Sequence, residues 1–251
     1  MESLPSHPEW TLPLLNRAHD PPGEPVLPDI LPFTISDEVS EKAEIAEHVM
    51  HLKNRKVAGP SGMRAEHLKV WYENGSQSWL DFVRVVQECF TTGEIPKAMC
   101  LSTLVLIPKA DGSLQGIGLL EVAWKVVSGI VQQRLQAGIE FEDSLHGFQP
   151  KHGVRTAMLV HKLITEQSLH GGQMLFQVFL DLKKAYNTLD RGWTLLILEQ
   201  YGVGPKVWHL LHKFWQGLEV VPQHSGYYGQ PIGSNCGVTQ GDIVSPTIFN
   251  I

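Results

Sequence analysis

The sequence contains no long apolar run. Nowhere in its 251 residues do 18 apolar residues follow one another, so no membrane-spanning helix is expected. The N-terminus has no basic stretch followed by an apolar one, which argues against a secretory signal. We therefore expect an intracellular protein, cytoplasmic or nuclear, that has no membrane partner.

Cysteine is scarce. The three cysteines, Cys89, Cys100 and Cys236, lie far apart in the sequence, and an odd number does not favour a disulfide framework. No Cys/His spacing is typical of a zinc site. Reduced thiols are therefore the expected state of these residues.

Net positive charge is missing as well. The formal net charge is −6, which on its own argues against a nucleic-acid partner. The acids are concentrated, however, because residues 1–50 hold ten acids and two bases, which leaves 16 acids and 18 bases for residues 51–251. The acidity thus belongs to the first segment. The remainder is only weakly basic, so charge alone does not identify a nucleic-acid-binding protein.

Proline is dense only at the start of the chain. Eight of the 16 prolines fall within residues 1–32, where they hinder helices and strand ladders alike. The pattern predicts a disordered, proline-rich leader over residues 1–35, with ordered structure from residue 36 onward.

The rest of the chain mixes helical and strand patterns. Apolar residues at helical spacing predict helices over about 37–52, 64–73, 77–91, 120–136, 155–168, 191–200, 206–216 and 243–251. Apolar or β-branched runs predict strands at 101–107, 113–119 and 175–180, with short strand-like pieces within 218–238. Helices and strands are segregated along the chain, which is typical of an α+β fold.

The chemistry-bearing signal is Asp181, which directly follows the apolar run 175–180. A carboxylate at the end of a buried strand is held rigidly. Such placement suits a site in which two Mg²⁺ ions lie about 3.5–4 Å apart and clamp the reacting oxygens. An aspartate that merely caps a turn explains the pattern equally well. The same arrangement occurs in P-loop NTPases, but the sequence has no G-x-x-x-x-G-K-[ST] motif, which excludes that class.

Six short motifs occur in a fixed order along the chain: Gly59-Pro60-Ser61-Gly62, Leu106-Ile107-Pro108-Lys109, Gly116-Ile117, His146-Gly147-Phe148, Asp181 to Tyr186, and Thr239-Gln240-Gly241-Asp242 with Ser245-Pro246. Over about residues 38–251 this order resembles the reverse transcriptases of non-LTR retrotransposons. The resemblance implies a reverse-transcriptase-like α+β fold with a fingers-like region over 36–172 and a partial palm over 173–251. It also implies RNA-directed DNA synthesis from dNTPs with Mg²⁺. An RNA template and a DNA primer would be the partners, and no small-molecule cofactor is needed.

The resemblance implies roles for the segment that begins at Asp181. Asp181 would be a catalytic, metal-binding carboxylate, and the carbonyl oxygen of Leu182 a further metal ligand. The backbone amides of Lys184 and Ala185 would face the triphosphate, as amides in turns commonly do. Tyr186 would be the steric gate whose ring occupies the place of a ribose 2′-hydroxyl. Plain core packing is the alternative for Tyr186.

Four further residues complete the implied nucleotide site. Lys109 would reach the triphosphate, although a solvated surface lysine is the alternative, and Gln240 and Gly241 would flank the incoming base. Gln115 stands where the family usually has an arginine, and a neutral amide supplies neither charge nor a guanidinium plane. Asp242 is expected at the N-terminus of the following helix, where it complements the helix dipole.

A basic cluster surrounds the Gly59–Gly62 loop. Lys53, Arg55, Lys56 and Arg64, with Lys69 nearby, face a single acid, Glu66. This cluster suits contacts to template phosphates, although a run of charges is usually a solvated face.

The sequence stops at Ile251, before the aromatic-x-Asp-Asp hairpin that supplies the other catalytic carboxylates in this family. We therefore expect residues 1–251 alone to be inactive, because one carboxylate cannot hold two metal ions. Two alternatives to a polymerase remain open: a non-catalytic nucleic-acid-binding module, and a decayed retroelement reading frame.

Overall fold

The fold is known from a computed structural model, which describes residues 35–251 except 111, 113 and 225. The leader predicted at 1–35 therefore lies, apart from Ile35, outside the described residues. The described helices are α2 (Lys42–His51), α3 (Ala65–Glu73), α4 (Gln77–Thr92), the 3-10 turn η2 (Lys97–Cys100), α5 (Val122–Gly138), α6 (Val154–His170), α7 (Ala185–Thr188), α8 (Arg191–Gln200), α9 (Pro205–Gly217) and α10 (Ser245–Asn250). The strands are β1 (Leu101–Pro108), β2 (Leu114–Leu120), β3 (Glu219–His224), β4 (Tyr227–Tyr228) and β5 (Ile232–Gly233).

The described strands form one mixed sheet. Its order is β2-β1-β3-β4, with β5 also paired to β3. β1 and β2 form an antiparallel hairpin with Val105 opposite Ile117, whereas β1 and β3 run parallel with Leu101 opposite Glu219. The parallel pair joins segments more than 100 residues apart, so the sheet ties the two halves of the chain together. The predicted α+β class is confirmed.

Most predicted helices form because their ends carry local signals. Ser76 accepts a hydrogen bond from the backbone of Trp79 and begins α4, and Gly93 ends it in a left-handed conformation. Asp190 begins α8 in the same way, by accepting from the backbone of Trp193. The hairpin predicted at 101–107 and 113–119 is confirmed, as are the strand pieces within 218–238.

The first helix of the described residues, α2, begins at Lys42, later than predicted, because the carboxylate of Asp37 binds another helix. Its two carboxylate oxygens accept hydrogen bonds from the backbone amides of Lys206 (2.9 Å) and Val207 (2.8 Å). These amides belong to the first turn of α9, where the helix itself provides no acceptor. Asp37 therefore caps a helix that lies 169 residues away in the sequence.

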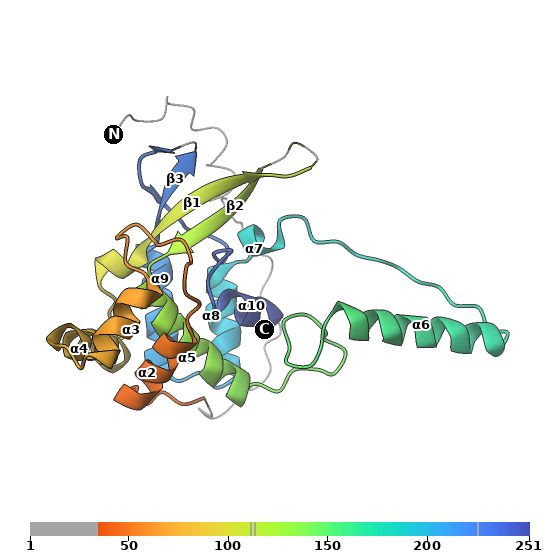
Figure 1. The fold of residues 1–251 in the computed structure, drawn as a ribbon. Coiled ribbons are helices and arrows are strands. Elements are labelled where there is room, and N and C mark those ends of the chain that lie inside the picture. The colour runs from red at the N-terminus through yellow and green to blue at the C-terminus, as the bar shows by residue number, and fades with distance from the viewer. Residues whose placement is uncertain (1–34, 111, 113, 225) are drawn as a thin grey trace.

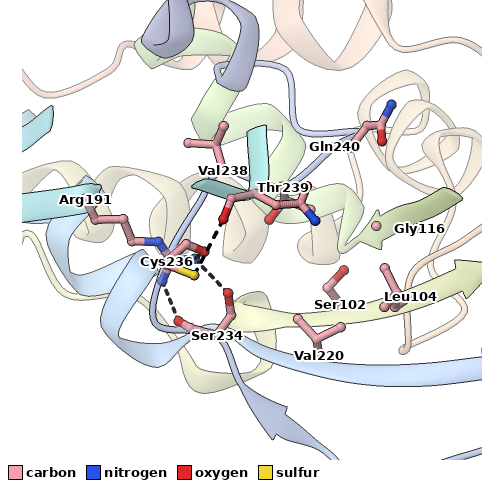
Figure 2. A pocket seen from close by; sticks show the side chains of 12 residues that line it. Ser102, Leu104, Gly116, Arg191, Val220, Ser234, Cys236, Val238, Thr239 and Gln240 are labelled. Atoms are coloured by element: carbon pink, nitrogen blue, oxygen red, sulfur yellow. Dashed lines mark hydrogen bonds between the residues drawn. The ribbon is translucent and has the colours of Figure 1, made fainter. Parts of the chain in front are cut away.

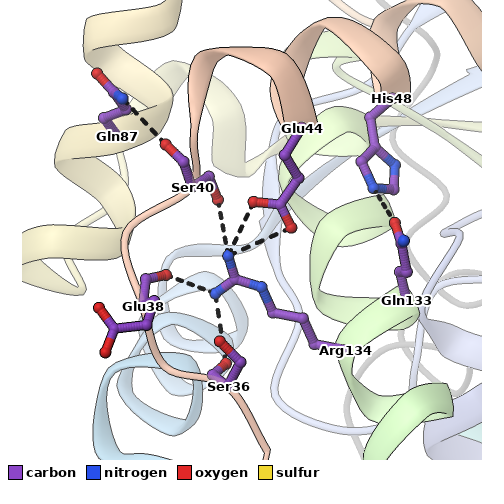
Figure 3. A network of polar contacts seen from close by, with 8 residues as sticks. All are labelled: Ser36, Glu38, Ser40, Glu44, His48, Gln87, Gln133 and Arg134. Carbon is purple, nitrogen blue, oxygen red and sulfur yellow. Dashed lines mark hydrogen bonds and ion pairs between the residues drawn. The ribbon is translucent and has the colours of Figure 1, made fainter.

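Arg134 of α5 fixes the segment that follows Asp37 (Figure 3). Its guanidinium donates to the carbonyl of Glu38 at 2.7 Å and forms an ion pair with Glu44 at 3.0 Å. The same group lies over the ring of Phe90, 4.8 Å from the ring centre. Together these contacts attach residues 36–44 to α5 and α4.

The core is a single cluster that extends from Ile35 to Ile248 and centres on α5. The ring of Trp124 stacks on that of Phe214 from α9, with 3.6 Å between the centres and an angle of 3° between the planes. Both rings are fully buried. The core thus includes residues on both sides of position 172, where we predicted the fingers-like region to end.

α6 does not belong to this core. The helix has no buried residue, and Figure 1 shows α6 and the extended segment after it projecting away from the rest of the molecule. The prediction of a strand at 175–180 is wrong, because these residues pair with no other described segment. The side chains of Phe176 and Leu180 are 83% and 90% exposed. Apolar composition alone does not form a strand, because a strand is stabilised by the neighbours it pairs with and packs against.

Candidate functional site

Tyr186 is held between two segments far from it in the sequence. Its ring stacks on that of Phe249 from α10, with 5.1 Å between the centres and 12° between the planes. The ring of Phe148 meets it edge-on at 6.4 Å. The side chain of Asn250 donates to the carbonyl of Gly147 at 2.7 Å, which ties the two neighbouring segments together. Partial burial raises the pKa of Tyr186 above its ordinary value of 10.0.

The Gln240-Gly241 turn lies directly on β2. The carbonyl of Gln240 accepts a hydrogen bond from the amide of Gly118 at 2.9 Å. A side chain at Gly118 would begin 2.3 Å from a methyl carbon of Thr239, and one at Gly241 would begin 2.6 Å from the carbonyl oxygen of Gly118. Gly241 also has a φ of +118°, which residues with side chains rarely adopt. Both glycines are therefore required for this close contact.

These motifs meet around a small hollow of about 60 Å³ (Figure 2). It is lined by residues from β1, β2, β3, α7, α8 and the segment 234–240, which are Ser102, Leu104, Gly116, Gly118, Asn187, Arg191, Val220, Ser234, Cys236, Val238, Thr239 and Gln240. The structure thus brings the segment beside Tyr186, the Gln240 turn and β2 to one place.

Arg191 supports this arrangement and was not singled out in the sequence. Its buried guanidinium donates to the carbonyls of Gly237 (2.8 Å), Trp215 (3.0 Å), Cys236 (3.1 Å) and Ser234, and to the hydroxyl of Ser234 at 2.8 Å. Figure 2 shows the side chain reaching toward Ser234 and Cys236. Burial lowers the pKa of Arg191 to about 10. A positive charge in the first turn of a helix opposes the helix dipole, and that mismatch is the signal in the sequence that marks Arg191.

Lys109 and Gln115 lie at the far end of the β1–β2 hairpin. Gln115 is opposite Ile107, three residues before the glycine that binds the Gln240 turn. Lys109 is exposed, and its carbonyl accepts from the amide of Gly112 at 3.0 Å. Gln115 therefore lies on the strand that contacts the Gln240 turn, and Lys109 directly follows the strand paired with it.

Asp181 is exposed and does not end a strand, so that part of the sequence argument is wrong. Leu182 and Lys184 are exposed too, and Lys184 has a left-handed backbone with a φ of +54° immediately before α7. Among the described residues, no group of three or more His, Cys, Asp or Glu side chains is arranged to hold a metal ion. Asp181 and Leu182 alone therefore do not form a complete two-metal site.

Asp242 does not begin the following helix, because α10 starts at Ser245. Its carboxylate is buried beneath α5 and accepts a hydrogen bond from the indole N–H of Trp124 at 3.0 Å. Burial raises the pKa of Asp242, and the hydrogen bond from Trp124 partly opposes that rise. Asp242 thus joins the segment after the Gln240 turn to the core.

The basic cluster divides into two groups. Lys53, Lys56 and Arg64 line a hollow of about 100 Å³. Arg55 is not part of this lining, and its backbone amide binds the carboxylate of Glu66. The ammonium of Lys69 is engaged by the carbonyl of Leu52 (2.7 Å) and the side chain of Asn54 (2.8 Å), so Lys69 holds the loop in place.

None of the described helices is both long enough and apolar enough to cross a membrane.

A sequence model of the family described as reverse transcriptase (RNA-dependent DNA polymerase) matches residues 107–251. The chain is 24% identical to the transposon TX1 uncharacterized 149 kDa protein of Xenopus laevis, over 88% of this chain and 17% of that protein. It is 23% identical to the RNA-directed DNA polymerase from mobile element jockey of Drosophila funebris, over 83% of this chain and 23% of that protein. It is 22% identical to the retrovirus-related Pol polyprotein from type-2 retrotransposable element R2DM of Drosophila melanogaster, over 67% of this chain and 16% of that protein.

The chain therefore spans less than a quarter of the length of these relatives. The family model, in contrast, covers more than half of the chain. On this basis the chain belongs to the reverse transcriptase family, and the relatives it resembles are proteins of non-LTR retrotransposons.

Proposed function

We propose that this chain contributes the nucleotide- and template-binding part of an enzyme that synthesises DNA on an RNA template from dNTPs. The observation that carries the proposal is the convergence of three separated segments on one hollow, namely β2, the segment beside Tyr186, and the Gln240 turn. A site that must orient a nucleotide needs such fixed positions, since small displacements weaken catalysis strongly. We propose that residues 36–172 form the fingers-like region of this enzyme and that residues 173–251 form part of its palm.

The proposed nucleotide contacts follow from chemistry. The ammonium of Lys109 and the backbone amides of Lys184 and Ala185 would bind the triphosphate, because charged and amide donors suit phosphate oxygens. Tyr186 would exclude a ribose 2′-hydroxyl, because its ring is clamped by Phe249 and cannot easily swing aside.

Further contacts would come from the hairpin and the Gln240 turn. Gln240 and Gly241 would flank the incoming base, and the missing side chain of Gly241 allows close approach. Gln115 would contact the nucleotide through its neutral amide, without the charge that an arginine supplies.

Enzymes of this family require a divalent metal ion. We propose Mg²⁺ as that ion, with the carboxylate of Asp181 and the carbonyl of Leu182 among its ligands. These two ligands do not complete a two-metal site, and no group of three or more His, Cys, Asp or Glu side chains among the described residues adds to them.

The same observation favours a second candidate, a nucleic-acid-binding module without catalysis. Both candidates require binding of a template, whereas only the first requires that Asp181 takes part in chemistry. The stacking of Tyr186 on Phe249 supports the polymerase, since the proposed steric gate would serve no purpose in a simple binding module.

Binding to a primed RNA template tests the proposal. We expect the purified chain to raise the fluorescence anisotropy of a labelled RNA–DNA primer–template, with an affinity that falls as salt increases. A duplex DNA of equal length serves as the control and should bind more weakly. Absence of binding to the primed template at low salt would overturn both candidates.

A further inference from the structure

Four cationic side chains converge on the hollow beside the Gly59–Gly62 loop. Three of them, Lys53, Lys56 and Arg64, come from the loop and its flanks, and the fourth, Lys125, comes from α5. The remaining lining residues are Leu52, Val57, Ala58, Gly59, Met63, Ala65, Leu120 and Val122. No acidic residue is among the described residues that line this hollow, which we call the loop–helix pocket.

Close packing of the loop on α5 creates this convergence. A side chain at Gly59 would begin 2.8 Å from the carbonyl oxygen of Leu120 and 2.9 Å from the amide of Glu121, so the loop backbone lies directly on the start of the helix. The carboxylate of Glu121 then binds the loop, by accepting from the amide of Ser61 at 2.6 Å and from its hydroxyl at 2.5 Å. Glu121 is therefore occupied by the loop and does not line the pocket.

Lys125 differs from the three loop cations because it is partly buried. Burial lowers the pKa of Lys125, while the nearby carboxylates of Asp242 and Glu121 partly oppose this change. In the part of the chain that the structure describes, its ammonium has no hydrogen bond and no ion pair. Partial burial of a charged ammonium raises the free energy of the fold, and a bound anion would offset part of that cost.

The pocket has the size and the backbone geometry that suit an oxyanion. A cavity of about 100 Å³ exceeds the roughly 10–15 Å³ that one water requires, so a tetrahedral group can replace several waters. Ala65, the first residue of α3, lines the pocket together with Arg64, which places the positive end of that helix at its wall. Charge, size and helix dipole thus point to the same class of ligand.

We propose that the loop–helix pocket binds one backbone phosphate of a single-stranded RNA template, with Lys125 as the cation at its inner wall. This proposal rests on the proposed function and deepens it, since it selects a discrete site from a diffuse basic cluster. Arg55 and Lys69 are excluded from the site, the first because it does not line the pocket and the second because its ammonium is already engaged.

The test compares matched variants of the whole chain with a short, labelled single-stranded RNA as the probe. Lys125→Met and Lys56→Met each remove one pocket cation and keep most of the aliphatic stem. We expect each to weaken RNA binding by about tenfold, and Lys125→Arg to restore most of it. The dependence of log affinity on log salt should become shallower by about 0.7 for each lost phosphate contact.

Two controls, Arg55→Gln and Lys42→Gln, remove the same charge elsewhere. Arg55 lies between Lys53 and Lys56 in the sequence but does not line the pocket. Lys42 is the first residue of α2, and the pocket lies at the opposite end of that helix, beside Leu52. Both variants should bind RNA within about twofold of the unmodified chain. If Arg55→Gln weakens binding as much as Lys56→Met, the cluster acts as a diffuse charged face and the pocket proposal is overturned.

Failure of this proposal is separable from failure of the proposed function. If the unmodified chain binds no RNA, the proposed function fails. If it binds RNA and the pocket variants bind equally well, only the pocket is refuted. Thermal unfolding of each variant checks the fold, and Lys56, which is exposed, carries the test if Lys125→Met does not fold.

Discussion

Asp242 and Tyr186 show how single residues connect the core to the proposed site. Both lie in motifs that pointed to nucleotide chemistry, yet both also serve the fold. The carboxylate of Asp242 is buried against Trp124, and the ring of Tyr186 stacks on Phe249. Substitutions at these positions therefore need readouts that separate stability from activity.

We expect Asp242→Asn to stabilise the chain at neutral pH. Asparagine still accepts from the indole of Trp124 but removes a buried charge. The raised pKa of Asp242 means that the folded state binds more protons than the unfolded state above the ordinary value of 3.8, so stability falls as pH rises through that interval. The gain in melting temperature should therefore be present at pH 7–8 and vanish below about pH 3.8.

Asp242→Leu is the matched control, because it removes both the charge and the acceptor. It should leave the Trp124 N–H unpaired and lower the melting temperature at acidic pH, where the charge plays no part. An equal gain for Asp242→Asn at acidic and neutral pH would contradict the assignment of the effect to the buried charge.

Tyr186→Val should weaken the selection of deoxynucleotides in any form of the protein that extends primers. Removal of the ring opens space for a 2′-hydroxyl, so we expect relative ribonucleotide incorporation to rise by about tenfold or more. Competitive primer extension with dNTPs and NTPs measures the ratio. Phe249→Leu, which removes only the stacking partner, should give a smaller rise. Unchanged selection in Tyr186→Val would show that the ring merely packs.

Among the elements, those with local signals were predictable. Ser76 and Asp190 lie directly before the helices they cap, and the β1–β2 hairpin joins neighbouring segments, so the sequence alone located these two helices and the hairpin. The strand expected at 175–180 failed because a strand needs a partner that no local pattern can supply. The start of α2 at Lys42 differs from the prediction because Asp37 binds the backbone of α9, which is distant in the sequence.

The residues of the proposed site also differ in whether a local sequence pattern marks them. The order of the motifs pointed to Tyr186, Gln240 and Gly241, whose role in nucleotide binding stays a prediction. Arg191 and Lys125 were missed, because their importance arises from burial and from contacts with distant segments. Residue type and spacing alone do not carry that information.

The segment between α6 and α7 should be the first part of the described chain that a protease cleaves. Its backbone forms no ladder, and its side chains are exposed. Limited proteolysis with mass spectrometry should give early cuts within residues 171–184. The fragments on either side should then elute together, because β1 pairs with β3 and α5 packs on α9 across the cut. Early cleavage in α4 or α5 would contradict the prediction that residues 171–184 are the most accessible segment. Immediate separation of the fragments would contradict the prediction that a common core holds them together.

At the scale of the whole molecule, one core serves both proposed regions. Residues before and after the boundary at 172 contribute to the same buried cluster. The proposed template-binding loop and the proposed nucleotide site are thus attached to the same core, and the exposed arm formed by α6 and residues 171–184 extends away from it.

We expect residues 1–251, assayed alone, to show no primer extension on an RNA template with Mg²⁺ and dNTPs. The described residues provide Asp181 without a cluster of further carboxylates, and two-metal chemistry requires more ligands. Incorporation of labelled dNTP is the measurement, and Asp181→Ala is the control. Template-dependent synthesis by the unmodified chain that Asp181→Ala abolishes would contradict this expectation.

Asp37 leaves the ribosome long before the helix that it caps. The first amide it binds, that of Lys206, lies 169 residues further on, and synthesis at about 5–20 residues per second makes that interval on the order of ten seconds. Arg134 emerges earlier and can hold the carbonyl of Glu38 in the meantime. Final docking of residues 35–44 must therefore wait for the last third of the chain, and closure of so long a loop makes it a slow, late step in folding.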